Sequence, residues 1–144
     1  MTFESVIQST LARFATNGRF VLLPGESLNK VLRREKVPNA RGVYLCFEGD
    51  DIEHPLYIGK SGTIRVDGSW GKQGITERLY ENGPRDQKRL FRELPAKECL
   101  AGLTFIWFVT HDQNIKIIPA LVEMELLQAH YDLRGCLPRL NKHV

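Results

Sequence analysis

The sequence predicts an α+β fold: a small, three-stranded antiparallel sheet flanked by helices. Two segments with alternating side chains, at 42–49 and 56–60, stand on either side of a polar turn and indicate a β-hairpin. A third segment, "LTFIWFVTH" at 103–111, is apolar and rich in β-forming residues, as expected of the central strand. The predicted order is β-β-α-α-β-α, which does not fit the alternating units of a parallel Rossmann-type sheet.

The N-terminal quarter of the chain predicts helices. Residues 1–37 are expected to form a helical extension that packs on a main domain of residues 38–144. Apolar residues recur at helical spacing over residues 3–14, and Asn17-Gly18 predicts the end of that helix. A second, short helix is predicted between residues 27 and 37.

Three further helices are predicted in the main domain. They cover residues 75–82, 85–94 and 120–133, and the last of these has Pro119 at its first turn. A glycine-rich loop joins the hairpin to the first of them, and the C-terminal residues have no regular pattern.

The composition is that of an ordinary globular protein of one domain, with 144 residues, 42% of them hydrophobic and 26% charged. No apolar run approaches the roughly 20 residues of a membrane span, and the N-terminus lacks the pattern of a secretory signal. A cytoplasmic protein without a membrane partner is expected. The cysteines Cys46, Cys99 and Cys136 are far apart, so they indicate neither a zinc site nor a redox pair.

Positive charge is concentrated in one part of the chain. The net charge is only +3, but the segment 60–92 has eight basic and four acidic residues. Such a segment is compatible with a polyanionic partner, and a solvated helix face would have a similar composition.

The tripeptide Gly59-Lys60-Ser61 is similar to the end of a phosphate-binding P-loop. A P-loop requires a glycine where this chain has His54, and a helix should begin directly after it. We therefore exclude a P-loop nucleotide site.

Two glycine–tyrosine tripeptides lie on the strands of the hairpin: Gly42-Val43-Tyr44 and Tyr57-Ile58-Gly59. Each alone is a weak signal, since tyrosine is common in strands and glycine permits a turn. Other elements follow in order: Lys60, then Arg78-Leu79, then Glu123 with Leu126 and Leu127, then Pro138-Arg139-Leu140-Asn141. Together they resemble the signature of the GIY-YIG nuclease superfamily, over roughly residues 38–141.

The resemblance implies a GIY-YIG-like fold and a metal-dependent endonuclease that hydrolyses DNA phosphodiester bonds. The implied catalytic residues are Tyr44, Tyr57, Lys60, Arg78, Glu123 and Asn141. Glu123 is the implied ligand of Mg²⁺ or Mn²⁺, hard ions that take oxygen ligands and retain several waters, so that one carboxylate can be enough.

The implied roles differ among these residues. Arg78 would hold the scissile phosphate, because a guanidinium is a fixed and permanently charged fork. Tyr44 would deprotonate or position the attacking water, and Tyr57 would contact phosphate or water; which tyrosine acts as base stays open. A base role requires nearby cations to lower the phenol pKa. Asn141 would brace the site from the C-terminal segment.

Several neighbours of these residues are candidates for other roles. Glu125 is a rival to Glu123, but helical geometry turns it elsewhere, as a solvated or ion-paired residue. Trp70 and Lys72 in the glycine-rich loop are candidate contacts to nucleic acid, with a loop anchor as the alternative for Trp70. His130 is a further candidate, and His111 could approach phosphate or end its strand with a hydrogen bond.

The expected partner is DNA, including structured or branched DNA, reached either directly or through a targeting protein, and two chains could form a homodimer for double-strand cutting. The alternative is a non-catalytic nucleic-acid-binding module on the same fold. A small-molecule-binding domain would leave the combination of Arg78, Glu123 and Asn141 unexplained.

Overall fold

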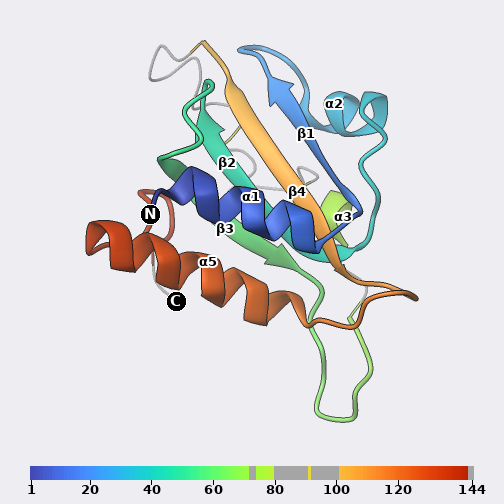
Figure 1. The fold of residues 1–144 in the computed structure, drawn as a ribbon. Coiled ribbons are helices and arrows are strands. Elements are labelled where there is room, and N and C mark those ends of the chain that lie inside the picture. The colour runs from blue at the N-terminus through green and yellow to red at the C-terminus, as the bar shows by residue number, and fades with distance from the viewer. Residues whose placement is uncertain (72–73, 80–90, 92–100, 143–144) are drawn as a thin grey trace.

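A computed structural model describes residues 1–71, 74–79, 91 and 101–142. In chain order the elements are α1 (Phe3–Arg13), β1 (Asn17–Leu22), α2 (Leu28–Arg34), β2 (Arg41–Glu48), β3 (Pro55–Ser61), α3 (Ile75–Leu79), β4 (Leu103–His111) and α5 (Pro119–Arg134). The strands form one antiparallel sheet in the order β1-β4-β2-β3 (Figure 1). The predicted hairpin and central strand are therefore confirmed.

The sheet has four strands, so the predicted three-stranded sheet is wrong in its strand number. The additional strand, β1, lies within residues 1–37, which were predicted to be helical. It pairs with β4 from Asn17 opposite Phe108 to Leu22 opposite Leu103. Phe20 and Leu22 are buried, so β1 adds to the core and the N-terminal segment is part of the sheet.

Both faces of the sheet are covered by helices (Figure 1). On one face α1 and α5 pack over apolar side chains that include Val43, Leu45 and Ile58. On the other face α2 and α3 pack over Tyr44, Tyr57 and their neighbours. Because successive side chains of a strand point to opposite faces, the predicted alternation in β2 fills two cores instead of separating a buried face from an exposed one.

The ends of the long helices follow from the sequence. Thr2 caps α1, and its hydroxyl accepts a hydrogen bond from the backbone of Ser5, while the Ser5 side chain bonds back in a capping box. Pro119 begins α5, and Gly135, in the left-handed conformation, ends it. In the described part of the chain no helix is long and apolar enough to span a membrane.

Some predictions lie outside the described residues. The helix predicted at 75–82 is described as α3 over its first five residues. The helix predicted at 85–94 is described only at Phe91, whose side chain is buried against Tyr57 and Phe105. Lys72 and most of the basic residues of segment 60–92 also fall outside the described residues.

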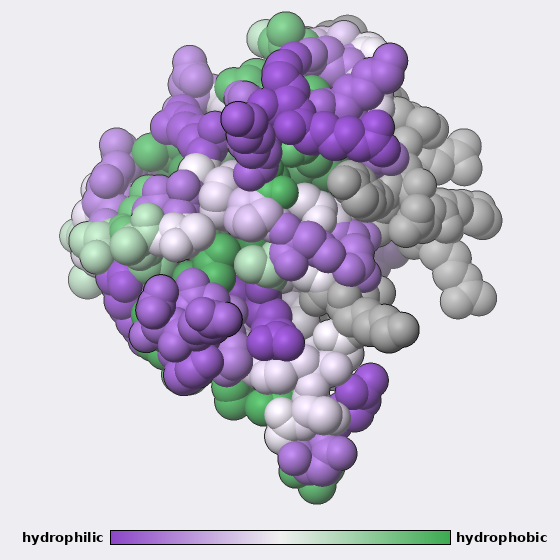
Figure 2. All heavy atoms as spheres, turned by 90° about the vertical axis from the view of Figure 1, so that its right-hand side faces the viewer, coloured by the Kyte–Doolittle hydropathy of each residue, from purple (hydrophilic) through white to green (hydrophobic). Residues whose placement is uncertain are grey.

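The glycine-rich loop between β3 and α3 projects from the body of the protein (Figures 1 and 2). Backbone hydrogen bonds order it, from Arg65 to the carbonyl of Ser69 and from Gly71 to that of Thr63. A β-bridge also joins Ile64 to Trp70. The predicted loop is therefore a structured hairpin, with Val66 fully exposed at its tip.

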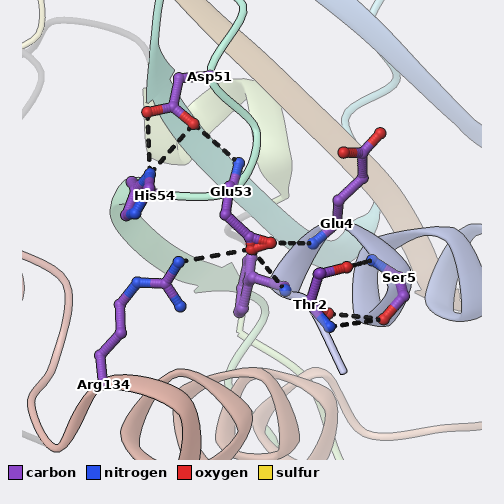
Figure 3. Close-up of polar contacts among 8 residues, drawn as sticks. Thr2, Glu4, Ser5, Asp51, Glu53, His54 and Arg134 are labelled. Carbon is purple, nitrogen blue, oxygen red and sulfur yellow. Dashed lines mark hydrogen bonds and ion pairs between the residues drawn. The ribbon is translucent and has the colours of Figure 1, made fainter.

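Glu53, in the turn between β2 and β3, connects the β2–β3 hairpin to α1 and α5 (Figure 3). Its carboxylate accepts hydrogen bonds from the backbone N–H groups of Phe3 (2.8 Å) and Glu4 (3.2 Å) and lies 3.4 Å from Arg134. Burial raises the pKa of Glu53, but these hydrogen bonds and Arg134 outweigh it, so the pKa is below its ordinary value. Glu53 thus caps α1 in place of water.

Candidate functional site

Tyr44 and Tyr57 lie together on the face of the sheet that α2 and α3 cover. Tyr44 stands opposite Gly59 in the β2–β3 ladder, and the two tyrosine rings have centroids 6.0 Å apart. Both are buried, with 2% and 8% of their surface exposed. A hydrogen bond joins their hydroxyl groups, so the two phenols form one polar pair in an otherwise apolar layer.

Gly59 makes room for this pair. A Cβ atom at position 59 would lie 2.6 Å from Cζ and 2.7 Å from Oη of Tyr44, and 2.7 Å from Cε1 of Tyr57. Real Cβ atoms do not approach other atoms so closely, so any side chain here would displace both rings. The glycine of the second tripeptide is explained by the position of the two phenols.

Arg78 reaches the phenol pair from α3. Its guanidinium donates a hydrogen bond to the Tyr44 hydroxyl, although much of the Arg78 side chain is exposed. Ile75 and Leu79 bury the opposite side of α3. The Ile75 N–H donates to the carbonyl of Ala40 at 2.9 Å, which fixes the start of α3 beside β2. Arg78 therefore presents a fixed cation at the boundary between the tyrosines and solvent.

Glu123 approaches from the other face of the sheet. It lies in the first half of α5, which packs against β3 and β2 opposite the tyrosines. The side chain is half-buried, and burial raises the pKa of Glu123, while Lys60 and Arg78 act in the opposite direction without cancelling it. Arg78 is close enough to act on both Glu123 and Tyr44, so the two faces meet electrostatically around the edge strand β3.

Burial also acts on Tyr44. It raises the Tyr44 pKa well above the ordinary value of 10.0, the neighbouring Tyr57 raises it further, and Arg78 opposes both. A base role for Tyr44 requires a lowered pKa, so this environment is the reverse of the one expected. The other predicted role, in which a protonated hydroxyl positions a water molecule, requires no such lowering.

Asn141 pairs with the outer edge of β3. Its Oδ1 accepts a hydrogen bond from the Ile58 N–H, and its Nδ2 donates to the Ile58 carbonyl, both at 2.9 Å. The Leu140 N–H donates to the carbonyl of Leu56, also at 2.9 Å. The amide thus acts as a short strand partner beside Tyr57 and Gly59, a contact that fits the bracing role predicted for it.

The rival carboxylate, Glu125, is turned away from this group. It is exposed and forms an ion pair with Arg13 of α1 at 2.9 Å. The prediction of an ion-paired residue is confirmed. Glu123, by contrast, has no described lysine or arginine in direct ion-pair contact.

His130 does not fit a contact to nucleic acid. Only 4% of its surface is exposed, its Nδ1 lies 2.6 Å from the carbonyl oxygen of Cys136, and its ring packs edge-on against Phe3. His130 is a packing residue between α1 and α5.

Trp70 is anchored, which was the alternative expected for it. The guanidinium of Arg41 lies over its ring at 4.5 Å, and the ring of His111 is 4.6 Å away. His111, at the end of β4, is also 3.4 Å from Arg41. Neither ring lies in the group formed by Tyr44, Tyr57, Arg78 and Glu123, which is called the tyrosine group below. Both rings line a separate cavity at the end of the sheet.

The donor set for a metal is small. Among the described residues no cluster of three or more histidine, cysteine or acidic side chains could hold an ion. Glu123 is a carboxylate on which both Lys60 and Arg78 act electrostatically. Mg²⁺ and Mn²⁺ tolerate one protein carboxylate when water and phosphate oxygens complete the shell, so the site fits such an ion with substrate present.

No family model, curated protein or solved structure matches the chain. The assignment of function therefore depends on the sequence pattern and on the geometry of this group of residues. One contributor has no signal in the sequence: Phe91, whose ring packs edge-on against Tyr57 at 5.6 Å and limits its movement.

Proposed function

We propose that the chain is a metal-dependent endonuclease that hydrolyses DNA phosphodiester bonds through a GIY-YIG-type site. One observation carries the proposal: Arg78 donates a hydrogen bond to Tyr44 and also lies close enough to Glu123 to oppose the rise in pKa that burial causes there. Three segments far apart in the sequence thus supply a phenol, a guanidinium and a carboxylate to one region. That combination meets the needs of phosphodiester hydrolysis better than those of a structural ion-pair network.

Each residue would have a defined task. Arg78 and Lys60 would bind the phosphate oxygens and stabilise the negative charge that grows on them in the transition state. The hydroxyl pair of Tyr44 and Tyr57 would orient the attacking water. Glu123 would hold Mg²⁺ or Mn²⁺, which supplies charge neutralisation and an activated water when bound. Asn141 keeps the backbone between Tyr57 and Gly59 in register.

One observation favours the second candidate, a non-catalytic nucleic-acid-binding module. The raised pKa of Tyr44 leaves its hydroxyl protonated at neutral pH, so it is no proton acceptor as it stands. A module would need the cations Arg78 and Lys60 but not Glu123. The role of the carboxylate therefore separates the two candidates.

The test is cleavage of plasmid, linear duplex and branched DNA with Mg²⁺ or Mn²⁺, comparing wild type with Glu123→Ala. The matched control is Glu125→Ala, since Glu125 lies two residues away on the same helix and pairs with Arg13 instead. We expect Glu123→Ala to lose at least 100-fold in rate while it still binds DNA, and Glu125→Ala to cut at the wild-type rate. Equal rates for all three proteins would exclude Glu123 as the metal ligand.

Arg78→Ala provides the second arm. It should reduce both binding and cleavage, since the guanidinium contacts phosphate before and during the reaction. Tight binding by wild type without cleavage under either metal would favour the module.

The substrate form and the assembly follow from the same assay. A chain with one site cuts both strands only as a dimer or in two visits. A rate of double-strand cutting that rises with the square of protein concentration would indicate a homodimer. Preference for branched DNA over linear duplex would indicate recognition of structure, and weak cutting of every substrate would point to a targeting protein.

A further inference from the structure

A cavity of about 540 Å³ opens at the end of the sheet where β2 begins and β4 ends. The side chains that matter in its lining are Arg41, Trp70, His111 and Lys116. Its lining comes in part from the projecting loop and from the segment that leads from β4 to α5, which both lie near the lower end of the ribbon in Figure 1. None of these four residues belongs to the tyrosine group.

Arg41 is held in a fixed position at this cavity. The pairing of β2 with β4 is irregular between Arg41 and Gly42, and such an irregularity redirects a side chain. The guanidinium stacks over Trp70 at 4.5 Å and lies 3.4 Å from Nδ1 of His111. Within the described residues no carboxylate forms an ion pair with Arg41, so its charge is stabilised by aromatic rings instead of by an acid.

The projecting loop is built to keep this stack together. Gly62, which directly follows β3, has a φ of 90°, in the left-handed region that favours glycine. A Cβ atom there would lie 3.0 Å from Cγ of Arg41 and 3.3 Å from Cζ3 of Trp70. Both the conformation and the space favour a glycine, and with it the loop closes on Arg41.

The second cation of the cavity is Lys116. Its Nζ donates a hydrogen bond to the backbone carbonyl of Asp112. The carboxylate of Asp112 accepts the N–H groups of Asn114 (2.8 Å) and Ile115 (3.0 Å), so it is engaged within its own turn. Burial, Lys116 and Arg41 lower the pKa of His111, and the Asp112 carboxylate opposes them without cancelling the shift. The cavity is therefore lined by two cations, Arg41 and Lys116, and by one carboxylate, Asp112, which is hydrogen-bonded within its own turn.

We infer that this cavity binds a backbone phosphate of the DNA strand a few nucleotides from the scissile one, through Arg41 and Lys116. The inference rests on the proposed function, since it takes the tyrosine group as the place of cutting. Arg41 precedes Tyr44 by three residues on the same strand, roughly 10 Å at the rise of a β-strand. DNA phosphates of one strand recur about every 3.4 Å along the helix axis, so one chain of phosphates can reach both places.

The test measures binding of a labelled duplex in EDTA, where no cutting occurs, at a series of salt concentrations. Wild type is compared with Arg41→Gln, Lys116→Gln and the control Lys30→Gln, an exposed cation on α2. We expect Arg41→Gln and Lys116→Gln each to weaken binding about fivefold to tenfold and to reduce the slope of log K against log salt by about 1. Lys30→Gln should match wild type.

Lys116→Gln keeps the result interpretable if Arg41→Gln should fail to fold, because Lys116 is exposed and lies outside the strands. Wild-type affinity and slope in Lys116→Gln and in a folded Arg41→Gln would overturn the inference, while the Glu123 experiment would be unaffected. Weakened binding by a protein that cuts no DNA would keep the phosphate site and remove the hydrolysis. The two failures are therefore distinguishable.

A second arm separates DNA from free phosphate as the source of the ligand. The fluorescence of Trp70, taken as the difference between wild type and Trp70→Phe, reports on the cavity. A response to a twelve-nucleotide oligonucleotide at concentrations at which inorganic phosphate has no effect would support a site for polynucleotide. An equal response to inorganic phosphate alone would overturn it.

Discussion

Replacing Gly59 with alanine tests whether the position of the phenol pair matters. The new Cβ would lie 2.6 Å from Cζ of Tyr44 and 2.7 Å from Cε1 of Tyr57. Carbon atoms pack best at about 3.5–4.0 Å, so the rings would have to move by roughly 1 Å. Tyr44 is fully enclosed, and its ring can move only if its neighbours also move.

The magnitude follows from two opposing terms. Forcing an extra methyl group into a packed core costs about 1–3 kcal/mol. Alanine also has less conformational freedom than glycine in the unfolded chain, which returns about 0.5–1 kcal/mol. We expect Gly59→Ala to lower the free energy of unfolding by about 1–2 kcal/mol and the melting temperature by roughly 5 °C. Displacing catalytic groups by about 1 Å should slow cleavage roughly 100-fold.

The assays are thermal unfolding and DNA cleavage, measured below the unfolding transition of the variant. Gly71→Ala is the control in the unfolding measurement, because the atom nearest to a Cβ at that position is 3.7 Å away. A Gly59→Ala protein that cuts DNA at the wild-type rate would refute the argument that the phenols act by position. Wild-type stability would refute the packing argument itself.

Three further outcomes are expected. Glu53→Gln should lower stability by about 1 kcal/mol at pH 7, measured by denaturant unfolding. Because the Glu53 pKa is lowered in the folded state, this contribution is present above the ordinary value of 4.5 and is lost as the pH falls through the folded pKa, so variant and wild type should converge in acid. Asn141→Ala should cost about 1–3 kcal/mol, since it leaves both backbone groups of Ile58 without their partner. For Glu123 the pKa is raised in the folded state, so the pH dependence is reversed. Its protonated form contributes fully to the free energy of unfolding below the ordinary value of 4.5, and this contribution is lost as the pH rises through the folded pKa. Glu123→Gln should therefore melt at a higher temperature than wild type at pH 7 and at the same temperature in acid.

The parts of the fold that local sequence patterns specify were predictable. Strand β1, which was not predicted, shows where such patterns stop being sufficient. β2, β3 and β4 follow from alternation and from β-forming residues within short segments. β1 is also rich in such residues, at Phe20–Leu22, but Asn17-Gly18 predicted only the end of the preceding helix. What makes it a strand is its partner, which lies more than 80 residues further along the chain. A Cβ at Gly18 would lie 2.6 Å from the Trp107 ring, so this glycine allows the close pairing and does not act only as a helix stop.

The candidate site shows a different limit. The types and order of its residues are in the sequence, and they predicted Tyr44, Arg78 and Glu123 as one group. Their environments depend on packing, which the order of residues does not specify. The burial that raises the pKa of Tyr44 comes from α3 and from Phe91 on the neighbouring Tyr57, and the ion pair that engages Glu125 comes from α1.

The position of β3 at the edge of the sheet explains how one site can draw on both faces. A central strand would have a neighbour on each side, and that neighbour would separate Glu123 on α5 from Arg78 on α3. At the edge only the short C-terminal segment pairs with β3, and it does so at Leu56 and Ile58, before the strand reaches Lys60. Beyond that point, within the described residues, the side of β3 carries no strand, and the carboxylate, the ammonium and the guanidinium can share one space. The edge of β3 beyond Ile58 is therefore open, whereas Leu140 and Asn141 cover it at Leu56 and Ile58. A strand placed against this edge would occlude the space between Glu123 and Arg78, so the proposed site requires the edge to stay open.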